Sequence, residues 1–459
     1  MRRIAGKDAE SPASGQPARR WGLPLVLRAL HHRNYRLFFG GQLISLTGTW
    51  MQTVAQSWLV YRLTGSAVLL GFVGFSSQIP VFLLAPVGGS AADRYNRRRI
   101  LVVTQTAAML LAFILAALTL SGRVQVWHVF VLAAFLGVVN AFDLPTRQAF
   151  VADMVGREDL INAIALNSTM FNGARMIGPA VAGLLIDTIG EGWCFLANGV
   201  SYLAVIAGLL MMSMTVRTPA PLPGSALASI IEGFRYVKRT RQIRALLLLL
   251  GLVSLVGMPY TVLMPIFAAQ ILHGGPRGLG ILVSAIGFGA LAGALTLAAK
   301  KGIRGLNSWV ALSATGFGVS LILFSLSRSF WLSAALLLPV GFSVMVEMAS
   351  SNTLIQSLVP DSLRGRVMAV YSMMFMGMAP LGSLLAGALA QRLGAPATVA
   401  IGGVVCMAGA MVFGLHLPAL RQEAKQIIVA LQAAGGEPPE EMTGEASVAA
   451  PLDPGNHKG

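Results

Sequence analysis

Twelve long apolar runs dominate this chain of 459 residues. Each run has roughly 20 or more residues with few charges, the length that a helix needs to cross the ~30 Å hydrocarbon core of a bilayer. A helix also satisfies its own backbone hydrogen bonds in lipid. We therefore expect an all-α membrane protein with twelve transmembrane helices. The runs are 36–61, 67–90, 100–121, 126–149, 161–188, 193–214, 246–272, 279–299, 308–327, 330–357, 365–391 and 396–417.

The composition agrees with a chain that lies mostly in lipid. Charged residues make up 11% of the sequence and the mean hydropathy is +0.70, whereas soluble domains carry about 25% charged residues. A net charge of +16 would suggest a nucleic acid partner in a soluble protein, but the basic residues here lie in short loops between apolar runs. We therefore expect a multi-pass protein of the cell inner membrane that contacts the lipid bilayer and no nucleic acid.

Lys and Arg are distributed unequally between alternate loops. The segment 94–99 alone holds four arginines, and 217–244 holds six basic residues. Basic loops stay on the cytoplasmic side of a membrane. Both termini are therefore expected in the cytoplasm, as an even number of spans requires. The loops of the opposite set hold at most one arginine each, namely Arg62, Arg123, Arg277, Arg328 and Arg392.

The two halves of the chain look like repeats of each other. A shift of 204 residues aligns Asp143 with Glu347 and Gly178 with Gly382. Many transporters consist of two repeats with the substrate site between them. We expect five segments: a cytoplasmic tail (1–35), an N-terminal six-helix bundle (36–214), a cytoplasmic linker with a basic amphipathic helix from Ile230 to Arg244 (215–245), a C-terminal six-helix bundle (246–417) and a largely disordered cytoplasmic tail (418–459).

The loop after the second run carries a specific motif. It reads Gly89-Ser-Ala-Ala-Asp93-Arg94-Tyr-Asn96-Arg97-Arg98-Arg99. This resembles the cytoplasmic loop signature of the major facilitator superfamily, with Asn96 at the position of a glycine. Asn tolerates a positive φ better than most residues, so we expect the turn to be retained. Gly89 is expected to let this helix touch the run 365–391. Asp93 should then face the N-terminus of that helix near Ser362, where negative charge is favoured.

A second motif lies in the run 161–188. The sequence Gly178-Pro179-Ala-Val-Ala-Gly183 is similar to the glycine–proline motif of proton-coupled antiporters in the same superfamily. A packing kink, which is common in helix bundles, is the alternative interpretation. The residues to which the two motifs assign a role in conformational change are Gly89, Asp93, Arg94, Arg98, Arg99, Gly178, Pro179 and Gly183.

Further segments narrow the resemblance within the superfamily. The first helix begins with Arg33-Asn-Tyr-Arg36, and the fourth run contains Asp143-Leu-Pro-Thr-Arg147-Gln. A third segment, Asp361-Ser-Leu-Arg364-Gly-Arg366, lies at the start of the eleventh run. These look like the branch that includes the bacterial enterobactin exporter and related drug and siderophore efflux proteins. The resemblance implies a major facilitator fold and proton-coupled export of a small molecule by alternating access. We also expect a monomer, no cofactor and no metal. An importer or uniporter of the same fold is the alternative.

Four ionisable residues inside the runs are candidates for proton coupling. Such groups cost about 2.5–3.5 kcal/mol at membrane depth and are often functional. Arg147 follows Asp143 by four residues and can pair with it on one helix face, either as a structural ion pair or as part of transport. Glu347 has no basic residue within a helical turn, and a desolvated carboxyl group can exchange protons near neutral pH. We expect coupling to involve Glu347, Asp143, Arg147 and Arg175, with Glu347 as the carrier. The neutral polar residues expected to line the substrate cavity are Gln52, Gln56, Gln78, Asn140, Asn172 and Gln356.

Motifs of two other classes are absent from the sequence. An ATP-driven pump needs a phosphate-binding loop, and the only Gly-Lys pair, Gly6-Lys7, is followed by Asp8. A membrane-embedded hydrolase would carry HExxH or GxSxG, and neither string occurs. We therefore expect a transporter and no enzyme. A membrane-embedded subunit or enzyme of another class is the runner-up.

Overall fold

The computed structural model describes residues 25–156, 158–213, 226–300, 302 and 305–418, and these are almost entirely helical. The tail from residue 419 onward and the first 24 residues lie outside the described residues. So does the Pro-rich part of the predicted linker (218–223). The disorder predicted for the tails therefore stays a prediction.

The N-terminal half contains six long helices after a short 3-10 helix, η1 (Leu25–His31). Their ends lie within four residues of the predicted runs, except that α4 ends six residues later than expected. The helices are α1 (Arg33–Thr64), α2 (Ala67–Arg94), α3 (Arg97–Leu120), α4 (Val126–Val155), α5 (Leu160–Ile189) and α6 (Glu191–Leu210).

The C-terminal half begins with an amphipathic helix, as predicted, but this helix ends before Thr240, and the next helix starts at Arg241 rather than residue 246. The expected single helix from Ile230 to Arg244 is therefore divided in two. The elements are α7 (Ala226–Arg239), α8 (Arg241–Leu252), η2 (Val253–Gly257), η3 (Met258–Leu263), α9 (Met264–Ile266), η4 (Phe267–Ile271), α10 (Gly275–Ala299), α11 (Leu306–Leu326), α12 (Phe330–Leu358), α13 (Asp361–Leu393) and α14 (Ala395–Leu415).

One predicted run, 246–272, is an irregular helix. From Val253 it passes through π and 3-10 turns before it ends at Ile271. Pro259 and Pro265 lie at the starts of η3 and α9. Proline has no backbone N–H and clashes with the preceding turn, and such departures from the α-helix often occur at functional positions.

Asn96 departs from the expectation drawn from the loop motif. Its φ is −63°, so the positive φ expected from the glycine position is wrong. Its Oδ1 instead accepts a hydrogen bond from the backbone N–H of Arg99 at 3.1 Å. Asn is a favoured N-cap because this bond satisfies a free N–H of the first helical turn. Asn96 therefore begins α3.

Ten helical segments of the described chain are long and apolar enough to cross a membrane. Two further helices, α1 with 32 residues and α5 with 30, are also long enough but do not meet the criteria for such spans. Both contain several polar side chains, such as Gln42 and Gln52 in α1 and Asn172 and Arg175 in α5. The number of long helical segments agrees with the predicted runs, and the two that are less clearly spans belong to the N-terminal half.

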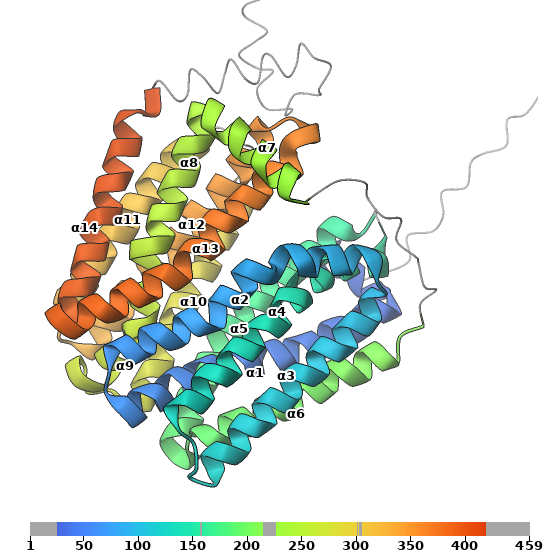
Figure 1. Ribbon diagram of the computed structural model, residues 1–459. Coiled ribbons are helices and arrows are strands. Elements are labelled where there is room, and N and C mark those ends of the chain that lie inside the picture. Colours follow the sequence, from blue (N-terminus) through green and yellow to red (C-terminus); the bar gives the residue numbers. More distant parts are fainter. Residues whose placement is uncertain (1–24, 157, 214–225, 301, 303–304, 419–459) are drawn as a thin grey trace, which may run out of the picture.

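The helices form two bundles, one from each half of the chain (Figure 1). Within the bundles, α2 packs on α4 and α3 on α6, and correspondingly α10 packs on α12 and α11 on α14. Two helix pairs make most of the contact between the bundles, α2 with α13 and α5 with α10. We call the end of the molecule with η1 and the end of α14 the terminus end, and the end with the α1–α2 turn the far end.

The two bundles touch through glycines near the far end. A Cβ atom added to Gly71 in α2 would lie 3.2 Å from the Cα atom of Gly387 in α13. A Cβ atom added to Gly183 in α5 would lie 3.0 Å from the Cα atom of Gly280 in α10. Small residues allow helix backbones to approach this closely. The backbones of the two bundles are therefore in direct contact at both crossings.

The bundles lie apart at the terminus end, as Figure 1 shows for α2 and α13. Gly89 in α2 and Gly365 in α13 have no atom within 4 Å of an added Cβ. The contact predicted between Gly89 and the run 365–391 is therefore not formed in this structure. The same two helices meet instead at Gly71 and Gly387, because they cross near one end and diverge toward the other.

Candidate transport site

Asp143 and Arg147 form the ion pair that their spacing predicts, at 3.2 Å between Oδ2 and Nη2. The other carboxylate oxygen accepts hydrogen bonds from Thr104 Oγ1 at 3.0 Å and from Gln105 Nε2 at 2.8 Å. Arg147 donates a further bond to Gln42 Oε1 at 3.0 Å. A buried ion pair is stable only when its remaining hydrogen-bonding capacity is also used. This network joins α1, α3 and α4 and lies entirely within the N-terminal bundle.

Glu347 has a different environment in α12. It is fully buried, and its one hydrogen bond is a long one of 3.4 Å from Ser351 Oγ. Its second carboxylate oxygen and the nearby Ser350 hydroxyl have no partner among the described residues. Tyr371 of α13 and Cys406 of α14 are close enough to interact with it electrostatically. Glu347 thus lies inside the C-terminal bundle without a cation beside it.

Arg175 is the predicted candidate that lies at the junction of the bundles. Its guanidinium carbon is 5.6 Å from the centroid of the Trp50 ring in α1. Trp50 in turn packs edge-on against Phe171, one turn before Arg175 in α5. A Cβ atom on Gly287 of α10 would lie 3.0 Å from the backbone oxygen of Arg175. The structure thus brings α1, α5 and α10 together at this arginine.

The glycine–proline motif lies at two helix crossings. A Cβ atom on Gly178 would meet Thr47 O and Trp50 Cβ, both at 2.7 Å, so this glycine packs α5 onto α1. Pro179 and Gly183 face Gly280 of α10 instead. The motif therefore holds α5 against its own bundle through one residue and against the other bundle through two.

The loop motif is mostly exposed at the terminus end. Asp93 is 3.6 Å from Arg97, and its side chain is 52% exposed. Arg97 also pairs with Asp153 of α4 at 2.9 Å, and Arg98 donates to the backbone oxygen of Leu210 at 2.8 Å. Arg97 was not among the predicted functional residues, although its four-residue spacing from Asp93 is the signal that would have found it. Arg94 and Arg99 are exposed.

The neutral polar candidates do not form one cluster. Gln52 accepts a hydrogen bond from Asn198 at 2.7 Å, and Asn172 donates to the backbone of Ser168 at 2.9 Å. Both are buried within the N-terminal bundle. Gln356 donates to Asn352 at 2.5 Å on an exposed face of α12. Gln78 is exposed, and Gln56 and Asn140 are half-buried.

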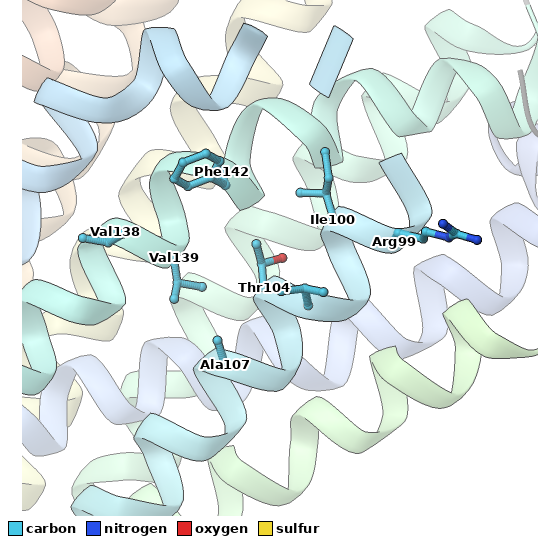
Figure 2. Close-up of a pocket in the computed structure, with 8 residues that line it drawn as sticks. Arg99, Ile100, Thr104, Ala107, Val138, Val139 and Phe142 are labelled. Carbon is cyan, nitrogen blue, oxygen red and sulfur yellow. The ribbon is translucent and has the colours of Figure 1, made fainter. Parts of the chain in front are cut away.

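A pocket of about 380 Å³ lies between α3 and α4. Figure 2 shows Val138, Val139 and Phe142 of α4 opposite Thr104 of α3, with Arg99 at one end. The pocket lies on one bundle only, since all of its lining residues come from these two helices. Thr104 connects it to the Asp143 network.

The match to a family covers most of the chain. The model for "Transmembrane secretion effector" proteins matches residues 26–434. The staphyloferrin A transporter of Staphylococcus aureus is 28% identical over 382 residues, which are 82% of this chain and 95% of that one. The multidrug efflux pump Tap of Mycolicibacterium fortuitum is 28% identical over 82% of this chain and 93% of its own. The enterobactin exporter of Shigella boydii is 24% identical over 86% and 94%.

Solved structures show the same fold. A transporter of the POT family in complex with a peptide conjugate superposes with a TM-score of 0.71 at 11% sequence identity, covering 84% of this chain and 96% of that one. The predicted resemblance to siderophore and drug exporters is confirmed, and so is the prediction that the protein is not an enzyme. The chain belongs to the transmembrane secretion effector family, within the major facilitator superfamily of membrane transporters.

Proposed function

We propose that this protein exports a small molecule across the inner membrane by alternating access, in exchange for protons. In this proposal α1 and α5 also span the bilayer, which gives twelve spans in two six-helix repeats, and both termini are cytoplasmic. The terminus end then faces the cytoplasm, and the structure corresponds to an inward-open state that is ready to take up its substrate.

The observation that carries the proposal is the one-sided contact between the bundles. Glycine crossings close the far end, whereas Gly89 and Gly365 have open space at the terminus end. Two rigid bundles joined at one end can rock between two arrangements around a site at the middle of the membrane. The loop motif would then act in the opposite arrangement, where Asp93 could reach the N-terminus of α13.

Glu347 is the best candidate for the exchanged proton. A charged carboxylate is unstable at membrane depth without a partner, so the buried Glu347 side chain favours the protonated form. Reopening of its surroundings to water would allow the proton to leave. Asp143, by contrast, has the cation Arg147 as its partner. One proton that moves down a potential of 100 mV releases about 2.3 kcal/mol.

Export rather than uptake is supported by two of the relatives, one of which is an exporter and the other an efflux pump. The test is transport in proteoliposomes that contain the full chain, loaded with a panel of siderophores and drugs, with and without an imposed pH gradient. Substrate movement against its gradient, opposite to the proton flow, is the expected result. Co-directional movement would indicate an importer, and movement independent of the pH gradient would indicate a uniporter or another ion.

The proposed orientation has a separate test. Cysteines replacing Ser121 and Gly275, which lie at the far end, should react with a membrane-impermeant thiol reagent in intact cells. A cysteine at Ser229 should not react until the cells are opened. The native Cys194 and Cys406 are both buried and serve as the unreactive background. Labelling at Ser229 equal to that at Ser121 would rule out cytoplasmic termini in a twelve-span protein.

A further inference from the structure

Arg175 lies near the middle of the membrane-spanning part of the molecule. It is close to the midpoint of α5, which runs from Leu160 to Ile189. At 1.5 Å per residue, either end of the helix is about 21 Å away, too far for an arginine side chain to reach water there. Trp50 occupies a similar middle position in α1. Transporters of this architecture bind substrate at this depth, between their repeats.

The charge of Arg175 is not balanced by any carboxylate in the part of the chain that the structure describes. Asp143 is paired with Arg147, and Glu347 lies inside the other bundle. The Trp50 ring provides a cation–π contact, which attracts the guanidinium but does not neutralise its charge. An unbalanced arginine at this depth is costly, and such residues usually mark substrate or ion pathways.

Tyr260 provides a second unsatisfied group beside this arginine. It belongs to η3, in the irregular helix of the C-terminal bundle. The side chain is 2% exposed, and its hydroxyl has no hydrogen-bond partner among the described residues. It lies close enough to Arg175 for the two groups to interact electrostatically. The guanidinium is exclusively a donor and the hydroxyl can donate as well. A bound hydrogen-bond acceptor, above all a charged one, would satisfy both groups.

We propose that Arg175, Tyr260 and Trp50 bind an organic anion, a carboxylate attached to an aromatic or apolar body. The planar guanidinium can bind a carboxylate through two parallel hydrogen bonds, the Tyr260 hydroxyl can donate a third, and Trp50 with Phe171 forms an apolar wall beside them. The site draws residues from both bundles, so an anion bound there would favour the arrangement that holds them together. The proposal names the substrate class of the exporter and depends on the proposed function only for transport, not for binding.

The test uses 1-naphthoate and its uncharged analogue 1-naphthylmethanol, with the full-length protein in lipid nanodiscs and empty nanodiscs as the blank. Equilibrium dialysis should show saturable binding of naphthoate and binding of the alcohol that is about tenfold weaker or less. Arg175→Gln should weaken naphthoate binding by about tenfold or more. The affinity of Arg175→Lys for naphthoate should lie between those of the wild type and Arg175→Gln. Tyr260→Phe should lose about fivefold. Arg277→Gln removes the same charge from an exposed position in α10 and should bind naphthoate like the wild type.

Three results would overturn the proposal: no saturable naphthoate binding to the wild type, equal affinity for the two probes, or full naphthoate affinity in Arg175→Gln. Unchanged weak binding of the alcohol and an unchanged elution profile show that a variant is folded. If the Arg175 variants do not fold, Tyr260→Phe still tests the site. Export and binding are separable. Naphthoate binding without transport in proteoliposomes would refute the exporter and keep the anion site. Transport without Arg175-dependent naphthoate binding would refute the anion site and keep the exporter.

Discussion

The buried carboxyl groups of the two bundles differ in their hydrogen-bond and ion-pair partners. Asp143 is tied to Arg147, Thr104 and Gln105, whereas Glu347, which is 204 residues later and aligns with it, has only the distant Ser351 hydroxyl. A buried carboxylate with several partners keeps its charge, and one without partners is stable mainly when neutral. The comparison shows that two positions aligned by sequence can differ in their partners: one is held by an ion pair and hydrogen bonds, and the other has a single long hydrogen bond.

The largest expected effect comes from Glu347→Gln. Glutamine keeps the shape of the side chain but cannot release a proton, so substrate-driven proton movement in proteoliposomes should be abolished while substrate binding persists. Glu158→Gln, at a side chain that is 90% exposed, is the matched control and should transport normally. Proton movement that survives in Glu347→Gln would transfer the role to Asp143, and survival in both Glu347→Gln and Asp143→Asn would mean that neither carboxyl group carries the proton.

Asp143→Asn should cause the largest loss of stability. The Arg147 side chain is 18% exposed, and removal of its partner would leave a buried charge uncompensated, at a cost of about 3–5 kcal/mol. The lower midpoint of thermal unfolding would report this, together with impaired binding and coupling. The double variant Asp143→Asn with Arg147→Gln should recover most of the stability. If the single variant is as stable as the wild type, the two carboxyl groups do not differ in the way proposed.

A smaller loss is expected for Gln105→Leu. Its amide donates to Asp143 at 2.8 Å from the neighbouring helix α3, and loss of a hydrogen bond to a charged group costs about 1–3 kcal/mol. Thermal unfolding should show a decrease that disappears when Asp143 is already replaced by Asn. A decrease that adds to that of Asp143→Asn would place the role of Gln105 in packing rather than in the network.

The smallest effect is expected for Ser351→Ala. Its hydroxyl lies 3.4 Å from Glu347, beyond the usual range of about 2.5–3.0 Å for such a bond, so the loss should be under about 1 kcal/mol. The losses of stability of Ser351→Ala and Gln105→Leu, both measured by thermal unfolding, compare how firmly the two carboxyl groups are held. A loss equal to that of Gln105→Leu would show that Glu347 is held as firmly as Asp143.

The helices could be predicted from the sequence because lipid requires long apolar runs, and the bounds of α5 and α12 agree to within one residue at each end. The interior of 246–272 could not be predicted. Its residues are uniformly apolar, and this pattern does not distinguish an α-helix from the π and 3-10 turns around Pro259 and Pro265. The break at Thr240 was missed for a related reason, since the amphipathic pattern continues across it.

In the candidate site, a contact between residues close in sequence could be predicted, whereas contacts between distant residues could not. The pairing of Asp143 with Arg147 follows from a spacing of four residues. Gln105 and Gln42 are 38 and 105 residues from their partners in this network, and no local pattern connects them. The contact expected at Gly89 is not formed because α2 and α13 diverge toward the terminus end, and no local pattern in the sequence fixes where two bundles meet. The roles assigned to the site residues stay predictions.

The glycine crossings at the far end have a consequence for how salt affects the protein. None of the hydrogen bonds or ion pairs found among the described residues there connects the two bundles; the crossings at Gly71 and Gly183 are contacts of backbone with backbone. Dispersion between such surfaces is not screened by dissolved ions, whereas exposed charges such as Asp93 and Arg364 at the terminus end are screened within about 8 Å at physiological ionic strength. Changes in ionic strength should therefore alter the contacts at the terminus end and leave the contacts at the far end unchanged. In the proposed transport cycle, this would shift the conformational equilibrium.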